Sequence, residues 1–151
     1  DIISLEPHSR RIDEAGIVES RDVVRALIER EKGRGIPVDR IFLAGFSQGG
    51  AVACATALTH PEPLAGLIAL STYIPSAELV LREAPPANQA LPVFAAHGSA
   101  DDVVSPALGR AARDLLAQHG CAVEWNEYPM PHSLCIEEIE HIGRWLRARL
   151  A

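Results

Sequence analysis

Short apolar segments alternate with helical patterns along this chain, and this alternation limits the possible folds more than any other feature of the sequence. Continuous apolar runs cover residues 40–45, 64–70 and 91–96, and residues 122–128 alternate between apolar and polar side chains. A strand covered on both faces gives a continuous apolar run, whereas a half-exposed strand gives alternation. Strands that alternate with helices predict an α/β fold, with a parallel sheet flanked by helices. In such sheets, functional groups collect at the carboxyl ends of the strands.

Helical periodicity fills the segments between these strands. Within residues 13–32, for example, Val24, Leu27 and Ile28 recur at the spacing of one helix face. Helices are expected over four segments, namely residues 13–32, 49–59, 105–120 and 134–150. Residues 74–90 are rich in proline and are expected to form a long loop that lines a binding site. The whole chain, with 151 residues, fits a single domain.

The charge and the apolar content speak against several classes of function. The formal net charge is −6, which disfavours a nucleic-acid partner, because such a partner requires a basic surface. No apolar run approaches the roughly 20 residues of a membrane span, and no secretory signal is visible. No group of histidine, cysteine and acidic residues has metal-ligand spacing, so neither a metal nor a cofactor is expected. Cys54, Cys121 and Cys135 form no C-x-x-C motif, and free thiols in a reducing, cytoplasmic compartment are expected.

The clearest chemical motif is Gly45-Phe46-Ser47-Gln48-Gly49, which lies between an expected strand and an expected helix. A G-x-S-x-G sequence in this setting predicts a sharp turn that exposes a nucleophilic serine, with small residues two positions away to avoid clashes. Ser47 is therefore the candidate nucleophile, and Gly45 and Gly49 are expected to leave it room. The N-terminus of the following helix favours an oxyanion, and the backbone N–H of Gln48 is one expected donor to it.

A nucleophilic serine needs a base and an acid that orients the base, in the chain order serine, acid, histidine for a turn of this type. His132 follows the last expected strand in a proline-rich loop and is the candidate base. His97 ends the third expected strand and is interpreted as structural, and His141 is expected to face solvent from the last helix. Asp101 and Asp102 both follow the third strand, and their spacing alone does not decide which of them is the acid.

Three stretches of the chain resemble the phospholipase/carboxylesterase family of α/β-hydrolases, which includes the acyl-protein thioesterases, and they are most similar to its bacterial carboxylesterases. They are residues 41–51 around Ser47, the segment His97-Gly-Ser-Ala-Asp101, which resembles the acid motif H-G-x-x-D, and the histidine loop Tyr128-Pro-Met-Pro-His132. The resemblance extends over nearly the whole chain. It implies the α/β-hydrolase fold, serine esterase activity without a cofactor, and Asp101 rather than Asp102 as the acid.

The family pattern also has an N-terminal segment that this sequence does not show. That segment supplies the first strands and an H-G-x-G loop whose N–H is the second oxyanion donor, and no such motif occurs before Ser47. The resemblance therefore implies an α/β-hydrolase domain over residues 1–151 that lacks the N-terminal strands. Its apolar strand edge, from Ile41 to Gly45, is expected to be exposed. We expect either the missing N-terminal segment or a second copy of the chain, in a homodimer, to cover this edge.

The resemblance implies hydrolysis of short- to medium-chain acyl esters through an acyl-enzyme. Ile74, Met130 and Leu134 are the candidate residues of the acyl site, whereas Leu79 and Val80 either join it or pack on the core. Two alternatives remain open. An acyl-protein thioesterase or lysophospholipase would use the same serine, acid and histidine with a longer apolar groove. A non-catalytic remnant would bind acyl ligands or a partner protein, and the intact serine, acid and histidine argue against it.

Overall fold

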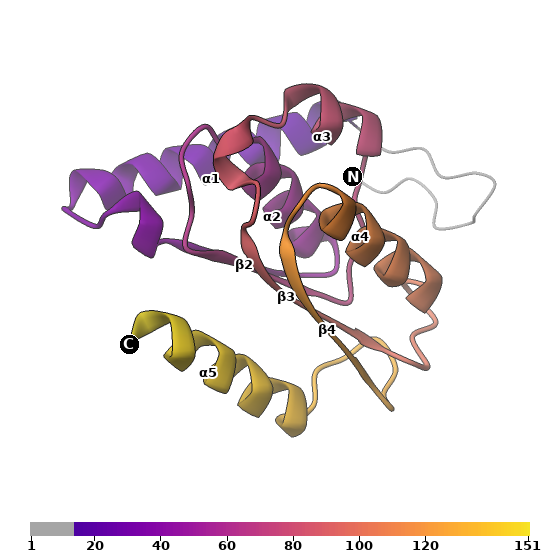
Figure 1. Ribbon diagram of the computed structural model, residues 1–151. Coiled ribbons are helices and arrows are strands. Elements are labelled where there is room, and N and C mark those ends of the chain that lie inside the picture. The colour runs from indigo at the N-terminus through magenta and orange to yellow at the C-terminus, as the bar shows by residue number, and fades with distance from the viewer. Residues whose placement is uncertain (1–13) are drawn as a thin grey trace.

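Four parallel strands form the centre of the computed structural model, which describes residues 14–151 (Figure 1). The strands are β1 (Phe42–Phe46), β2 (Gly66–Leu70), β3 (Pro92–Gly98) and β4 (Ala122–Tyr128). They pair in the order β1-β2-β3-β4, so each strand lies beside the one that follows it in the chain. Because parallel neighbours require a crossover connection, helical segments join every pair. The predicted parallel sheet is confirmed.

Helices cover both faces of this sheet. They are α1 (Glu14–Gly33), α2 (Gln48–Thr59), α3 (Ala77–Glu83), α4 (Pro106–Gln118) and α5 (Ile136–Leu150), with two short 3-10 turns, η1 (Val38–Arg40) and η2 (Pro86–Asn88). In Figure 1, α5 lies on one side of the sheet and the other four helices lie on the opposite side. Helix α2 packs on β1 and β2, α4 packs on β3 and β4, and α1 packs on α2. The expected start of the first helix at Asp13 lies outside the described residues.

Residues 74–90 differ from the predicted loop, because they contain α3 and η2. Helix α3 begins at a side-chain cap, in which the Ser76 hydroxyl accepts a hydrogen bond from the Leu79 N–H at 3.2 Å. The prolines that suggested a loop flank α3 and do not interrupt it. Leu79 and Val80 are both buried, and Val80 belongs to the main core cluster, so this pair packs on the core.

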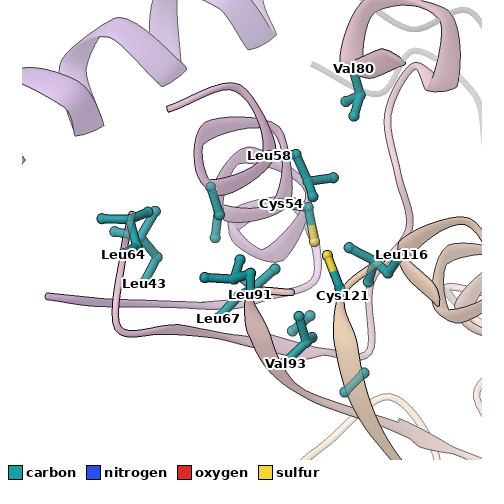
Figure 2. Packing of buried hydrophobic residues seen from close by; sticks show 14 of the residues in the cluster. Leu43, Cys54, Leu58, Leu64, Leu67, Val80, Leu91, Val93, Leu116 and Cys121 are labelled. Atoms are coloured by element: carbon teal, nitrogen blue, oxygen red, sulfur yellow. The ribbon is translucent and has the colours of Figure 1, made fainter. Parts of the chain in front are cut away.

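The two faces of the sheet carry separate apolar clusters, because successive side chains of a strand point to opposite faces. On β2, Leu67 and Ala69 belong to a cluster with residues of α2 and α4, whereas Ile68 and Leu70 belong to a cluster with Trp145 of α5. Figure 2 shows the first cluster, in which side chains of the helices meet those of the strands. Burial of the central strands on both faces explains why their sequences are continuously apolar.

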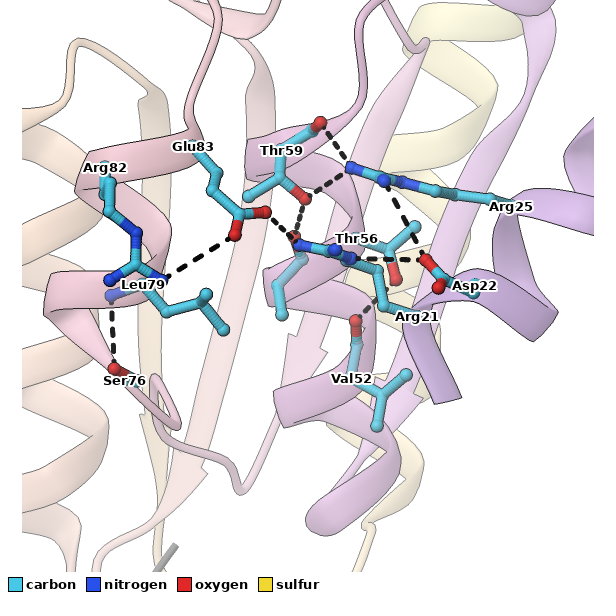
Figure 3. Close-up of polar contacts among 11 residues, drawn as sticks. Arg21, Asp22, Arg25, Val52, Thr56, Thr59, Ser76, Leu79, Arg82 and Glu83 are labelled. Atoms are coloured by element: carbon cyan, nitrogen blue, oxygen red, sulfur yellow. Dashed lines mark hydrogen bonds and ion pairs between the residues drawn. The ribbon is translucent and has the colours of Figure 1, made fainter. Parts of the chain in front are cut away.

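Polar contacts join α1 to α2 and α3 (Figure 3). Arg21, which is only 6% exposed, donates to the Glu83 carboxylate at 2.5 Å. Arg25 donates to the backbone oxygen of Thr59 at 2.6 Å and to its hydroxyl at 2.9 Å. The hydrogen bond from Arg21 lowers the pKa of the Glu83 carboxyl. These contacts hold α3, and with it the segment that follows β2, against the first helix.

Strands β1 and β4 are the two edges of the sheet that residues 14–151 form. On β1, Leu43 is buried, Ala44 is exposed, and Phe42 and Phe46 are half-buried. The apolar edge from Ile41 to Gly45 therefore lies open in the described part of the chain. Within residues 14–151, none of the helices combines the length and the apolar character of a membrane-spanning segment.

Candidate active site

Ser47 lies on the sharp turn between β1 and α2. Its φ of 56° and ψ of −125° lie outside the regions that non-glycine residues favour, so the turn is strained. Two contacts hold this conformation. The Ser47 N–H donates to the Leu70 oxygen at 2.9 Å, and the Thr72 hydroxyl donates to the Ser47 oxygen at 2.6 Å. Strand β2 and the residues after it therefore fix the backbone of Ser47.

The space around this turn shows which of its glycines are required. A Cβ atom on Gly45 would lie 2.3 Å from the Gly49 oxygen, and one on Gly50 would lie 2.6 Å from the Thr72 Cβ. A Cβ atom on Gly49 would meet nothing within 4 Å. The prediction that Gly45 has no room for a side chain is confirmed. The same prediction for Gly49 is wrong, because the close approach involves the backbone of Gly49 and the side-chain position of Gly50.

Three side chains from separate segments meet at the carboxyl end of the sheet. His132 Nε2 lies 3.0 Å from Ser47 Oγ, and His132 Nδ1 lies 2.7 Å from Asp101 Oδ2. Ser47 follows β1, Asp101 follows β3 and His132 follows β4. The sheet thus brings together residues that are up to 85 positions apart in the chain. Their geometry is that of a nucleophile, a base and an acid in series.

The structure distinguishes Asp101 from its neighbour Asp102. The Asp101 side chain is fully buried, and its Oδ1 accepts hydrogen bonds from the N–H groups of Val103 and Val104, both at 2.9 Å. Burial acts to raise the pKa of this carboxyl, but the hydrogen bonds from His132 and from the two N–H groups outweigh it, so its pKa lies below the ordinary value. Asp101 is therefore an ionised acceptor that directs its other oxygen at His132, whereas Asp102 is exposed.

Backbone contacts tie the loop of the acid to the loop of the histidine. The Ser99 N–H donates to the Tyr128 oxygen at 2.8 Å, and the Ala100 N–H donates to the Met130 oxygen at 3.1 Å. Gly98 permits this approach, because a Cβ atom on it would lie 2.3 Å from the Pro131 oxygen. The two loops form one unit, which explains how Asp101 and His132 keep a fixed separation.

The other predicted site residues have different surroundings. Gln48 is the first residue of α2, directly after Ser47, so its backbone lies at the helix N-terminus, where an oxyanion donor is expected. Met130 is buried in the cluster that α5 covers, Ile74 packs against the main core cluster, and Leu134 is 48% exposed. The role of these three apolar residues as an acyl site stays a prediction.

Two cavities of the described part do not have Ser47 in their lining, although Thr72, which donates to the Ser47 oxygen, lines the second. A cavity of about 330 Å³ lies between β4 and α5, with Asn126, Arg144 and Trp145 among its lining residues. A second, of only about 10 Å³, lies between β3 and α4 and has His97 in its wall. Within residues 14–151, no group of three or more histidine, cysteine or acidic side chains is placed to hold a metal ion.

Two histidines outside the series have defined contacts that the sequence pattern did not reveal. His141, which was expected to face solvent, is half-buried, and its Nδ1 lies 2.7 Å from the Tyr128 hydroxyl. His97 is buried, and its Nε2 lies 3.4 Å from Asp101 Oδ2. The sequence signal for the second contact is the position of His97 in H-G-x-x-D, four residues before the acid.

Comparison with known proteins identifies curated relatives that are longer than this chain. The acyl-protein thioesterase 1 of Neurospora crassa is 46% identical over 152 residues, which cover 97% of this chain and 61% of that protein. The acyl-protein thioesterase 1 of Mycosarcoma maydis is 41% identical over 159 residues, which cover 97% of this chain and 66% of that protein. The chain therefore spans less than two thirds of the length of these relatives.

The fold and the family follow from two further matches. The crystal structure of SOBER1 from Arabidopsis thaliana matches with a TM-score of 0.89 at 31% sequence identity, over 94% of this chain and 68% of that one. The sheet and helices described above accordingly belong to the α/β-hydrolase fold, as predicted. The model of the phospholipase/carboxylesterase family matches residues 1–150. Because that match takes in nearly every residue, the chain belongs to the phospholipase/carboxylesterase family.

Proposed function

We propose that this chain carries the catalytic residues of a serine hydrolase that cleaves carboxylic esters through an acyl-enzyme. The observation that carries this proposal is the continuous series from Asp101 through His132 to Ser47, with separations of 2.7 and 3.0 Å. A serine on a strained turn, in contact with an oriented histidine, is the arrangement that nucleophilic catalysis requires. Relatives that carry the names acyl-protein thioesterase and carboxylesterase support the same class of reaction.

In the proposed reaction, the Ser47 hydroxyl attacks the ester carbonyl carbon while His132 Nε2 takes its proton. The tetrahedral intermediate collapses when His132 returns that proton to the leaving oxygen, which leaves Ser47 acylated. Water then attacks the acyl-enzyme, with His132 again as the base, and the carboxylic acid is released. Asp101 accepts the Nδ1–H of His132, which fixes the tautomer and stabilises the imidazolium that forms in each half-reaction. This scheme requires no metal and no cofactor.

The oxyanion of each tetrahedral intermediate would lie at the N-terminus of α2. The backbone N–H of Gln48 and the positive end of the helix dipole would stabilise it there. Hydrolases of this fold use a second N–H donor as well. Loss of one donor typically lowers kcat by about 10²–10³. The kcat of this chain therefore indicates whether a second N–H donor contributes to its oxyanion hole.

Short- to medium-chain acyl esters are the proposed substrates. Ile74, which follows β2, and Leu134, which follows His132, offer apolar surface near the strand ends for an acyl group of limited length. The second candidate function is hydrolysis of long-chain acyl thioesters or lysophospholipids, and the names of the fungal relatives favour it. A series of p-nitrophenyl esters from acetate to palmitate separates the two, because a long apolar groove shifts the optimum of kcat/KM to the long chains.

The first test is hydrolysis of p-nitrophenyl butyrate by the parent chain, by Ser47→Ala and by Ser20→Ala. Ser20 is an exposed residue of α1 and serves as the matched control. We expect turnover by the parent and the control, and loss of at least about 10³-fold in Ser47→Ala. A fluorophosphonate should also add once to the parent, with the adduct on Ser47. Equal residual rates in three folded proteins would contradict the proposal and favour a non-catalytic binding role.

We further propose a cytoplasmic location and a covered β1 edge. The free cysteines Cys54, Cys121 and Cys135 suit a reducing compartment. The open apolar edge from Ile41 to Gly45 favours a second copy of the chain, or a preceding segment of the same protein, as its cover. Sedimentation of the 151-residue chain tests the first possibility, because a monomer at all concentrations would exclude the homodimer.

A further inference from the structure

The imidazole of His97 is enclosed directly beside the serine–histidine–acid series. His97 lies near the end of β3 and is 1% exposed. Its Nε2 lies 2.8 Å from the Val104 oxygen and 3.4 Å from Asp101 Oδ2. The same carboxylate oxygen lies 2.7 Å from His132 Nδ1. Two imidazoles therefore flank one oxygen of Asp101, one from inside the fold and one from the site.

The neighbours of His97 determine which of its nitrogens carries the proton. A backbone carbonyl and a carboxylate can only accept hydrogen bonds, so Nε2 is the donor. His97 Nδ1 is sealed from solvent and has no hydrogen-bond partner among residues 14–151. Nε2 is therefore the ring nitrogen that makes polar contacts, and it faces the Val104 oxygen and the Asp101 carboxylate.

Packing leaves the His97 ring little freedom. A Cβ atom on Gly109 of α4 would lie 2.3 Å from His97 Nδ1 and 2.9 Å from its Cε1, so the helix backbone lies close against the ring. The ring of Trp125 lies nearby as well, with centroids 6.3 Å apart. Because this packing restricts the His97 ring, the ring can in turn restrict the positions of the Val104 oxygen and the Asp101 carboxylate.

We propose that His97 is a positioning residue, whose Nε2–H donates to the Val104 oxygen and whose ring, 3.4 Å from Asp101 Oδ2, keeps the carboxylate in the arrangement that directs it at His132. The proposal rests on the serine hydrolase function proposed above and adds a fourth residue to its machinery. Val104 connects the two ends of this arrangement, because its oxygen accepts from His97 and its N–H donates to Asp101 Oδ1 at 2.9 Å. Without the His97 donor, the turn that carries Asp101 would lose the hydrogen bond that fixes the Val104 oxygen.

Four substitutions separate positioning from packing. His97→Phe keeps a ring of similar shape and removes the donor, whereas His97→Gln places an amide N–H near the position of Nε2. Gly109→Ala retains His97 but introduces a methyl group that must displace its ring. Gly143→Ala in α5 is the matched control for the last change, because the nearest atom lies 3.5 Å from the added Cβ, an ordinary contact.

Each variant is compared with the parent in three measurements: kcat and KM for p-nitrophenyl butyrate, thermal unfolding, and the NMR resonance of the His132 Nδ1 proton, assigned by its loss in His132→Asn. We expect kcat to fall about 10- to 100-fold in His97→Phe and Gly109→Ala, with KM nearly unchanged, because small displacements of catalytic groups have effects of this size. The His132 Nδ1 proton should exchange faster with water in both. His97→Gln should recover most of kcat, and Gly143→Ala should match the parent.

A folded His97→Phe variant with parental kcat and an unchanged His132 Nδ1 proton would overturn the proposal. Equal losses of kcat in His97→Phe and His97→Gln would overturn it too, because the effect would then follow packing and not the donor. If His97→Phe does not fold, the comparison of Gly109→Ala with Gly143→Ala decides, and parental kcat in both contradicts the role. If the parent shows no turnover that depends on Ser47, the proposed function fails, and the NMR comparison alone decides the role of His97.

Discussion

The phenyl ring of Phe46 lies against the imidazole of His132, with ring centroids 4.6 Å apart and ring planes inclined by 43°. Phe46 is the last residue of β1, directly before Ser47, and it is half-buried at the margin of the cluster that α5 covers. The side chain that precedes the candidate nucleophile therefore also limits the rotation of the candidate base. The end of β1 therefore influences the position of the Ser47 hydroxyl and that of the His132 imidazole.

Replacement of this ring should slow catalysis without abolishing it. An aromatic pair contributes about 0.5–1.5 kcal/mol beyond its buried area, so Phe46→Leu should lower kcat by roughly 2- to 10-fold while KM stays close to the parental value. Phe42→Leu is the control, because its ring pairs with Trp145 at 5.9 Å and not with His132. It should lower the midpoint of thermal unfolding and leave kcat intact. Identical kcat values for Phe46→Leu and the parent would show that the ring does not restrain His132.

The two neighbouring aspartates should differ sharply in their effect on turnover. Asp101→Asn should lower kcat by about 10³–10⁴, because an amide no longer stabilises the imidazolium or the required tautomer of His132. Asp102→Asn should retain nearly parental kcat, since Asp102 is exposed and its neighbour makes the contact with the histidine. Steady-state kinetics with p-nitrophenyl butyrate decides between them, and a larger loss in the Asp102 variant would reverse the assignment.

The glycines of the turn should respond to alanine with opposite signs in the free energy of unfolding. In Gly45→Ala the new Cβ would lie 2.3 Å from the Gly49 oxygen, which is backbone and cannot move aside. Overpacking of this kind costs about 1–3 kcal/mol. Gly49→Ala has open space and lies within α2, so it should raise the free energy of unfolding by up to about 1 kcal/mol. Urea unfolding of both variants measures the difference, and similar destabilisation by both would contradict this description of the turn.

The three cysteines should differ in their reaction with iodoacetamide. Burial raises the pKa of Cys54 to about 12 and that of Cys121 to about 11, and the thiolate is the reactive form. Cys135 is only half-buried. Near neutral pH the native chain should therefore gain one adduct, on Cys135, and the chain unfolded in urea should gain three. Peptide mapping by mass spectrometry locates the adducts, and rapid modification of Cys54 in the native state would show that α2 opens readily.

Much of the fold could be predicted because burial leaves a periodic trace in the sequence. Strand β4 has the predicted bounds, Ala122–Tyr128, and α2 begins one residue before its predicted start. Helix α3 was missed because it is short and prolines lie on both sides of it, which gives the composition of a loop. A short helix of this kind depends on its contacts, such as the bond from Arg21 to Glu83, and these join residues that are 62 positions apart.

The site was predictable as far as strand order could place it. Ser47 follows β1 and His132 follows β4, the two edges of the described sheet, and they can meet because parallel strands end at the same side of the sheet, where the loop after β4 brings His132 to Ser47. Spacing could not separate Asp101 from Asp102, because the hydrogen bonds that orient Asp101 come from backbone N–H groups two and three residues later. The neighbourhood of His97 was hidden for a similar reason, since it depends on how the turn after β3 folds back on the strand.

The place of β1 at the edge of the described sheet would make the proposed catalysis depend on extension of the sheet. Because β1 is an edge strand in the described residues, Ser47 stands at the border of the sheet and not at its centre. A parallel strand added on that side would lie about 4.8 Å away, and the loop after it would begin at the same end of the sheet as Ser47. An N–H from such a loop could reach the oxyanion only after the two strands had paired. The rate of ester hydrolysis in solution would then rise when a further strand pairs with β1, so kinetics could follow the extension of the sheet.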